Sequence, residues 1–530
     1  MSDKSVKYYS YLFLLIYLII GIYLCLTTGI SHDEFHEQTN WEINLKAIKS
    51  FFLTGEYNEL LNYKDKYHGI GFQLISQPIQ YFITNIFGDF FSISDYGVKL
   101  FSKHIVVFFL FSFSGYYFYL ISKKIIQNVY FPFISTSIYL LYPYLFGHSH
   151  FNPKDIPFLS FWVIATYCFI RLFEKFIKNE NIKFFDLIFL SLSTSLLVST
   201  RIVGFLILFQ YLVFFFVYLE ISKKTISSFK TLLKTILKFL ILLFLFIFIF
   251  NPIFWHNPLE IFNSILWMKK YQQEICTLTL GNCLQSLNLP ASYYFIWFFF
   301  KLPILIILGL FLFPFVEKKI SKDKISGIII YSFIITVFLI LFLFIFLNVA
   351  IYDELRHIMF LIPLIFLISL SFLFHFDQKI FTVASLILAL LFILENYKIN
   401  PYQYTWMNSF AKFYSINKNF EVDYWGISTK KIQKEIVNDH NKKKDDLMNI
   451  KKNCIYGGMY ADLYLKKEGF LCFKSYSELD NAKDRPYYVI KNFRNLKRSN
   501  PKDCNLIHQA KYKYLFGNQE ILTGSLWYCD

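Results

Sequence analysis

The sequence predicts an α-helical protein that spans a membrane many times and carries a small α/β domain at its C-terminal end. Hydrophobic residues make up 55% of the 530 residues and charged residues only 17%, and the mean hydropathy is +0.42. A soluble chain of this length needs far more charged surface, so much of the apolar surface must face lipid. The residues from 395 onward are more polar and contain only short apolar runs, which indicates a domain outside the membrane.

The predicted spans are about eleven runs of roughly 20 mostly apolar residues, the length that crosses a bilayer as a helix. They are 8–27, 99–121, 126–146, 155–175, 184–200, 202–220, 235–254, 291–315, 326–348, 356–374 and 378–394. The stretch 69–92 is also apolar, but Gly69, Gly71, Pro78 and Asp89 interrupt it, which favours an interfacial or re-entrant segment. No small-residue cleavage site follows the first span, so we expect it to be an uncleaved signal anchor.

The basic residues, which give a net charge of +16, predict the orientation of the spans. They gather on alternate connections, at Lys4 and Lys7, Lys123 and Lys124, Arg171 to Lys183, Lys223 to Lys238, and Lys318 to Lys324. The positive-inside rule makes those connections and the N-terminus cytoplasmic. The remaining connections are then extracytoplasmic, together with the C-terminal domain: 28–98, 147–154, the residues around Arg201, 255–290 and 349–355. This ordinary use of lysine also argues against a nucleic-acid partner.

The cysteines agree with that orientation. Six of the eight lie in segments expected outside, at Cys276, Cys283, Cys454, Cys472, Cys504 and Cys529, whereas Cys25 and Cys168 lie within spans. Such a distribution suits an oxidising outer compartment. The run CTLTLGNC, 276–283, predicts a disulfide-closed hairpin with Gly281-Asn282 as its turn. The pairing of the other four cysteines stays open.

The C-terminal domain, 395–530, opens with a lysine-rich helical stretch near 427–452. Short apolar runs follow at 454–457, 470–473, 487–490, 505–508 and 521–528, with polar segments between them. This alternation predicts a small α/β domain. The rest of the chain, 1–394, is the transmembrane domain, with 28–98 as its first outer loop.

The first candidate for chemistry is the run SHDEFHE, 31–37, directly after the first span. A capping box explains Ser31 and Glu34 and predicts a helix that ends near Gly55. It leaves Asp33 without a structural role, so Asp33 is a candidate general base, with Glu34 as its neighbour. His32 and His36 are one helical turn apart, and the alternative is that they hold a divalent metal ion with the acids.

The second candidate is FNPKDIPF, 151–158. In a structural interpretation Asn152 caps a helix, Pro153 takes its first position, and Asp155 complements the positive helix end. A cap does not require a lysine and an acid side by side at a membrane surface. Asp155 is therefore also a candidate second acid, and Lys154 a candidate ligand for an anion.

Four further residues are candidates for binding phosphate. Arg201 interrupts a long apolar stretch, where a charge is unfavourable unless it faces a cavity, and Arg356 and His357 lie at the outer end of a span. Arginine offers a fork of donors that suits phosphate, although both arginines could instead extend to the membrane surface. Lys301 lies about ten residues inside its span, too deep to reach the surface easily.

Acids and cations on one membrane face suit the transfer of a sugar from a lipid phosphate. Such a donor already has a good leaving group, so the enzyme needs a base and cations but no general acid, unlike a glycosidase. The alternative is a flippase or transporter of lipid-linked sugars, although transporters place polar groups at the membrane midplane. A third interpretation makes the C-terminal domain a sugar- or partner-binding module on a membrane anchor.

Several motifs resemble one known group when taken in chain order. They are the acidic pair Asp33-Glu34, NPKDIPF, STRIVG at 199–204, NPIFWHNP at 251–258, LPASYYF at 289–295 and LRHIMFLIP at 355–363. The sequence resembles the GT-C glycosyltransferases, in the branch of protein mannosyltransferases and lipid A aminoarabinose transferases. NPYQYTWMN at 400–408 and DYWG at 423–426 resemble a bacterial subgroup of that branch.

The resemblance implies an inverting transferase with a polyprenyl-phosphate sugar donor and an active site on the extracytoplasmic face. The resemblance to the bacterial subgroup favours a bacterial inner membrane, and the alternative, the endoplasmic reticulum, satisfies the same orientation and cysteine arguments. The family resemblance places the family's two acidic positions on Asp33, with Glu34 beside it, and on Asp155, and its phosphate-facing cations on Arg201 and Arg356. Some members use a divalent metal. The chain has no insert of the size of the MIR domain of protein mannosyltransferases, and the acceptor (protein, lipid or glycan) stays open.

Overall fold

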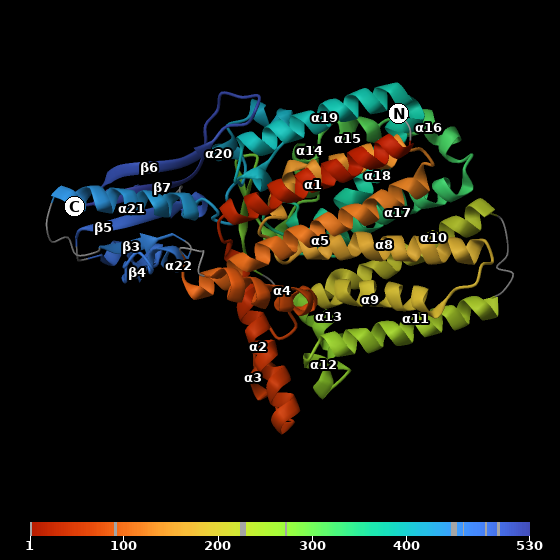
Figure 1. Ribbon diagram of the computed structural model, residues 1–530, viewed down its shortest axis with the longest axis horizontal. Coiled ribbons are helices and arrows are strands. Elements are labelled where there is room, and N and C mark those ends of the chain that lie inside the picture. The colour runs from red at the N-terminus through yellow and green to blue at the C-terminus, as the bar shows by residue number, and fades with distance from the viewer. Residues whose placement is uncertain are drawn as a thin grey trace.

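The computed structural model describes residues 3–88, 93–222, 229–270, 273–446, 453–458, 460–482, 485–495 and 499–530. Long helices lie side by side along the longest axis of the molecule, and a small domain with a sheet lies at one end of them (Figure 1). The α-helical class with a C-terminal α/β domain is therefore confirmed.

Eight helical segments of the described chain are long and apolar enough to cross a membrane. They are α1 (Asp3–Thr27), α5 (Asp95–Ile125), α8 (Asp155–Ile177), η2 with α10 (Ile202–Ser222), α11 (Phe229–Phe250), α17 (Lys324–Phe346), η4 with α18 (Arg356–Phe376) and α19 (Gln378–Lys398). Each coincides with a span expected from the sequence. The chain is a multi-pass integral membrane protein.

The three remaining predicted spans are helical but shorter or interrupted. The segment 126–146 divides into α6 (Tyr130–Leu141) and α7 (Pro143–His148), and 184–200 forms the 17-residue α9 (Phe184–Thr200). The segment 291–315 divides into α14 (Ser292–Lys301), α15 (Ile304–Leu310) and the start of α16 (Phe313–Ile320). Proline explains two of these breaks, because Pro143 and Pro303 lack the amide hydrogen that would continue the preceding helix.

The first outer loop contains α2 (His32–Thr54), α3 (Asn58–Leu61) and α4 (Gly71–Phe87). Ser31 and Gly55 flank α2 as expected, and Gly55 has a φ of 75°. Figure 1 shows α2 and α3 extending away from the long helices. The helix α4 continues through Pro78 as one helix, and the interfacial or re-entrant placement of this segment stays a prediction. Asp89 lies outside the described residues.

A second outer connection contains α12 (Ile253–His256), α13 (Glu260–Lys270), the strands β1 (Cys276–Thr279) and β2 (Asn282–Gln285), and η3 (Ser286–Asn288). The predicted hairpin is confirmed, and Cys276 and Cys283 are joined. Its turn is Leu280-Gly281, one residue earlier than expected, because Asn282 pairs with Thr279 in the ladder.

The C-terminal domain has a mixed five-stranded sheet of order β4-β3-β5-β7-β6. The strand β3 (Cys454–Gly457) is parallel to β4 (Phe473–Lys474) and β5 (Tyr487–Asn492), whereas β7 (Ile521–Cys529) is antiparallel to β5 and to β6 (Asn505–Tyr512). Helices α21 (Thr429–Asp446) and α22 (Ala461–Leu465) and the short η7 (Tyr476–Asn481) and η8 (Phe493–Asn495) complete it. Of the helical stretch expected at 427–452, residues 447–452 lie outside the described chain.

The six cysteines expected outside the membrane are all paired. The two bridges in the C-terminal domain are Cys454–Cys472 and Cys504–Cys529. Cys25 and Cys168, the two within spans, are free.

The C-terminal domain is packed onto the bundle rather than tethered to it. The segment after α19 contains η5 (Gln403–Thr405), η6 (Ser409–Phe413) and α20 (Ile416–Asn419), and Trp406 and Phe420 belong to the core of the bundle. The Lys430 ammonium donates to the Leu26 and Thr28 carbonyls at the end of α1, at 2.9 and 3.1 Å. The transmembrane domain and the C-terminal domain therefore share packed surface on both sides of residue 395.

The connections fall into two sets at opposite ends of the bundle (Figure 1). The first outer loop and the C-terminal domain lie at one end, and the described basic connections around 124–130, 178–183 and 318–324 lie at the other. The positive-inside rule requires the basic connections to lie on the side opposite the other connections, and the structure has this separation. The compartment that each end faces stays a prediction.

The Cys504–Cys529 bridge gives a test of the packing of the C-terminal domain. It closes a loop with a sequence separation of 25, and a loop of that size stabilises a fold by about 3 kcal/mol. We expect Cys504→Ser to lower the thermal unfolding midpoint in detergent and to expose the C-terminal domain to protease. Cys168→Ser, which removes a free cysteine, is the matched control. Equal protease resistance in both variants would contradict a stabilising role of the bridge.

Candidate active site

Six charged side chains of alternating sign form a continuous chain where the outer connections meet the C-terminal domain. In spatial order they are Arg494, Asp353, Arg356, Asp33 with Asp155, and Arg201. They come from η8, the 347–355 connection, the start of η4, α2, α8, and the break between α9 and η2. Four of the six are residues that the sequence indicated, and the fold brings all four together.

Arg356 is the central member. Its guanidinium lies 3.1 Å from an Asp33 carboxylate oxygen, 3.5 Å from Asp353 and 4.0 Å from Asp155. One face of the guanidinium lies 4.6 Å from the ring centre of Trp425, and the Tyr352 ring centre is at 4.9 Å. A cation that is only 5% exposed needs such partners, because burial of an unpaired charge is strongly unfavourable.

Asp33 is the most accessible acid of this chain of charges. Its side chain is 26% exposed, compared with 1% for Asp155 and 5% for Asp353. It sits in the first turn of α2, and Arg356 holds one of its carboxylate oxygens. A substrate can therefore approach Asp33 more readily than either of the other acids.

Asp155 is held on several sides at the start of α8. It forms an ion pair with Arg201, accepts a hydrogen bond from the Asn152 amide at 2.9 Å, and faces Arg356. The side-chain oxygen of Asn152 accepts from the Lys154 and Asp155 amides, but the N-cap residue is Lys154 rather than the expected Asn152. The helix begins at Asp155 rather than at Pro153.

Glu34 differs from Asp33 although the two are adjacent. One of its oxygens accepts from the Ser31 amide at 2.6 Å, which completes the expected capping box, and the other lies 2.9 Å from His104 Nε2. Its side chain is buried. The structure therefore gives Glu34 a role in holding α2 against α5, and its catalytic role stays a prediction.

Lys154, a candidate ligand for an anion, is buried and forms an ion pair with an acid of the protein itself. Its ammonium lies 3.1 Å from Glu37 and donates to the Gly69 carbonyl at 3.0 Å. Gly69 itself lies so close to α9 that a Cβ there would come within 2.2 Å of the Ser199 carbonyl oxygen. Lys154 thus connects α2, α8 and the 67–70 turn.

Lys301 is part of a separate buried ion pair. Its ammonium lies 2.7 Å from Glu354, both side chains are fully buried, and the ring centre of Tyr144 is 4.6 Å away. Burial raises the pKa of Glu354 above its ordinary value, and the Lys301 charge opposes that rise. Lys301, which the sequence indicated to be too deep to reach the surface, is therefore paired with an acid of the 347–355 connection.

The three histidines that the sequence indicated have different neighbours. His357 packs its ring against Tyr352, with centres 4.6 Å apart. His32 lies beside Tyr460 of the C-terminal domain, whose hydroxyl is 3.0 Å from its Nδ1. His36 faces His68, with ring centres 5.0 Å apart, and the joint metal site of His32 and His36 stays a prediction.

Five contributors went unrecognised in the sequence: Glu37, His68, Asp353, Trp425 and Arg494. Asp353 had the same signal as Asp33, an acidic pair beside the end of a span, in the run IYDELRH. Trp425 belongs to the DYWG motif, in which buried Asp423 accepts from the Ile427 and Ser428 amides and so fixes the turn. Arg494 had no local signal, because only the fold of the C-terminal domain brings it to Asp353.

The pKa directions of Asp353 and Arg494 follow from burial and from their neighbours. Burial raises the pKa of the Asp353 carboxyl above its usual value, and the Arg494 and Arg356 guanidinium groups oppose that rise. Burial disfavours the charged form of Arg494, but the Asp353 and Glu421 carboxylates raise its pKa above the usual value. Arg494 is therefore a permanent cation.

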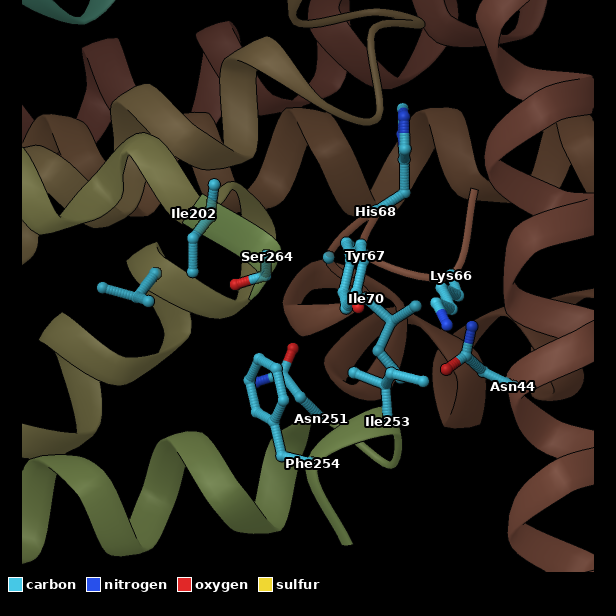
Figure 2. A pocket seen from close by; sticks show the side chains of 12 residues that line it. Asn44, Lys66, Tyr67, His68, Ile70, Ile202, Asn251, Ile253, Phe254 and Ser264 are labelled. Carbon is cyan, nitrogen blue, oxygen red and sulfur yellow. The ribbon is translucent and has the colours of Figure 1, made fainter. Parts of the chain in front are cut away.

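A hollow lies beside these residues, between the 66–70 turn, the break after α9 and the end of α11 (Figure 2). Asn44, Tyr67 and Asn251 give it polar groups, and Ile70, Ile202 and Phe254 give it apolar ones. Its outline of about 370 Å³ includes open solvent, and the room left between the lining atoms is about that of one water molecule. It adjoins Arg201 through Ile202, the next residue in the chain.

No protein family model and no curated protein sequence matches the chain significantly. Among solved structures, it is similar to ArnT from Cupriavidus metallidurans in the apo state, with a TM-score of 0.45 and 9% identity over 97% of each chain. ArnT bound to undecaprenyl phosphate gives 0.42 and 9%, over 97% of this chain and 98% of that one.

The apo oligosaccharyltransferase of Archaeoglobus fulgidus gives a TM-score of 0.45 and 11% identity, over 92% of this chain and 70% of that one. Both proteins are GT-C superfamily members, the superfamily that the sequence motifs resemble. Because these TM-scores lie below 0.5, the likenesses establish nothing about the activity of this chain.

The Lys301–Glu354 pair gives a test of how the site is supported. We expect Lys301→Met to destabilise the protein by about 3–5 kcal/mol, because it leaves the Glu354 carboxylate buried without its cation. The double variant Lys301→Met/Glu354→Gln should recover most of that loss. Thermal unfolding in detergent measures both, with Lys322→Met, at an exposed position, as the control. A single variant as stable as the control would contradict the pairing.

Proposed function

We propose that the protein is an inverting glycosyltransferase that moves a sugar from a polyprenyl-phosphate donor to an acceptor on the extracytoplasmic face of the membrane. The observation that carries the proposal is the exposure and the orientation of the Asp33 carboxylate. This carboxylate is partly exposed, it lies at the end of the helical bundle, and a guanidinium holds one of its oxygens. A general base requires this combination of access and fixed orientation.

In the proposed reaction Asp33 accepts the proton of the acceptor hydroxyl as that oxygen attacks the anomeric carbon. The bond between the anomeric carbon and the phosphate oxygen breaks, and polyprenyl phosphate leaves with the bonding electron pair. Attack from the face opposite the phosphate inverts the anomeric configuration. The phosphate needs no proton to leave, so the reaction requires one base and no general acid.

The cations supply the second requirement, stabilisation of the departing phosphate. Arg201, 13% exposed, and Arg494, 37% exposed, can reach a substrate more readily than Arg356. An arginine has five N–H donors, so it can bind a phosphate oxygen while it keeps one carboxylate partner. Arg201 is therefore the proposed donor ligand, and Arg356 holds Asp33 and Asp155 in place beside it.

The other predicted cations fit supporting roles. Lys154 and Lys301 form ion pairs with Glu37 and Glu354, and His357 lies against Tyr352, which borders Arg356. Asp155 and Glu34 are buried, so each orients a neighbour rather than meeting the acceptor. Under this proposal the catalytic group is Asp33 alone, and Asp155 is a positioning residue for Arg201.

The orientation of the chain is part of the proposal. The basic connections face the cytoplasm together with the N-terminus, and the site and the C-terminal domain face the outside of a bacterial inner membrane. The three disulfide bridges at the site's end of the molecule support an oxidising compartment there.

A flippase of lipid-linked sugars is the second candidate, because the same arginines would bind the donor phosphate without a reaction. The position of Asp33 separates the two functions. A flippase has no use for a partly exposed base beside its phosphate ligands, whereas a transferase requires one.

Replacing Asp33 tests the proposed base. We expect Asp33→Asn to lower release of polyprenyl phosphate from a radiolabelled polyprenyl-phosphate sugar at least about 100-fold, with donor binding retained. The measurement uses the purified chain in lipid with candidate acceptors. Asp95→Asn is the control, because Asp95 is also in the first turn of a helix at this end but is fully exposed. Normal release by Asp33→Asn would refute the assignment.

Replacing Arg201 tests the proposed donor ligand. We expect Arg201→Ala to raise the KM for the donor at least about tenfold, because a charge-assisted contact to phosphate is lost, and Arg201→Lys to have a smaller effect. Arg171→Ala, at an exposed arginine on the opposite end of the bundle, should leave the KM unchanged. A change confined to kcat would instead point to an effect through Asp155.

A further inference from the structure

We propose that His36, Glu37 and His68 form a binding site for a single zinc ion beside the site described above. The three offer one ligand atom each, and these atoms all lie within 4.8 Å of one another. In the part of the chain that the structure describes, this is the one such group of three. The inference does not depend on the proposed transfer, because its test measures the metal alone.

The donor set suits zinc. Zinc in proteins prefers imidazole nitrogen and carboxylate oxygen, and three protein ligands leave a fourth position for water or a substrate oxygen. With bonds of about 2.0 Å in a tetrahedral arrangement, two ligand atoms lie about 3.3 Å apart, so each needs to move by at most about 1.5 Å. Small side-chain rotations are sufficient for such movements.

The backbone already brings the ligands together. His36 and Glu37 are adjacent in α2, and His68 lies in the turn that precedes α4. The Asn40 amide of α2 donates to the His68 carbonyl at 3.1 Å, and Lys154 holds the next carbonyl, that of Gly69. The turn is thus held by one hydrogen bond to α2 and one to the start of α8, and neither bond involves a metal-binding ring.

The side chains show an incomplete arrangement that a metal would complete. Nε2 of His36 is buried and has no hydrogen-bond partner among the described residues, which is unfavourable for an imidazole nitrogen. The His68 ring packs at right angles against His36 and against Trp267, with centres 5.0 and 5.3 Å apart. These contacts hold the His68 ring beside His36, and His68 also lines the hollow of Figure 2, through which an ion can reach it.

The nearest cation is compatible with the site. Both oxygens of Glu37 lie 3.1 Å from the Lys154 ammonium, so a metal would take one oxygen and leave the other to the lysine. Lys154 then acts as an outer partner that orients a metal-bound carboxylate. His36 follows Asp33 by three residues in α2, about one helical turn, so the metal would fix the part of the helix that carries the proposed base.

The experiment measures zinc bound to the purified full chain. The protein, freed of any histidine tag and treated with chelator, is dialysed against micromolar ZnCl₂, and bound zinc is counted by elemental analysis. Cobalt in place of zinc reports the geometry by its visible absorption. We expect one zinc per chain and a cobalt spectrum of the tetrahedral type, with a higher unfolding midpoint in zinc.

Variants separate this site from adventitious binding. His36→Asn and His68→Asn should each weaken zinc affinity at least about tenfold and remove the zinc-dependent rise in the unfolding midpoint. His32→Asn, at the histidine that lies against Tyr460, should retain both. Absence of zinc in the unaltered chain, equal binding in His68→Asn, or a loss confined to His32→Asn would each overturn the proposal.

Discussion

The buried guanidinium of Arg356 is the interaction on which the arrangement of the site depends. An arginine in this position is tolerated only if carboxylates and aromatic rings surround it, and here they come from α2, α8, the 347–355 connection and the DYWG turn. Each partner is fixed in turn by a local structure, such as the Asn152 side chain, which hydrogen-bonds both the carboxylate and the backbone amide of Asp155. One cation therefore sets the relative positions of four segments that are far apart in the chain.

The C-terminal domain is a structural part of the site. It supplies Arg494 to Asp353, Trp425 to the face of Arg356, and Tyr460 to His32. Tyr464 accepts a hydrogen bond from the Ile30 amide at 2.9 Å, immediately before α2. The interpretation of this domain as a separate binding module on an anchor leaves these contacts unexplained, whereas a site built between the two domains accounts for all of them.

Local signals in the sequence were reliable where a local interaction decides the structure. The capping box of α2, the disulfide hairpin and the short strands of the C-terminal domain are all found. Signals for function were less complete, because a charged residue near a span end has several uses. In the sequence, Glu34, Lys154 and Lys301 are charged residues near span ends, like Asp33 and Arg201. In the structure each of these three is buried in an ion pair, with His104, Glu37 and Glu354 respectively.

The sequence by itself determined the class of the protein, most of its helices and strands, and the end of the molecule at which its charged residues gather. Composition, apolar length and caps act over a few residues, so they can be recognised without the fold. Only the tertiary structure decided which charges pair and which stay accessible. That outcome depends on contacts between residues hundreds of positions apart, such as Asp33 with Arg356, and no local pattern encodes them.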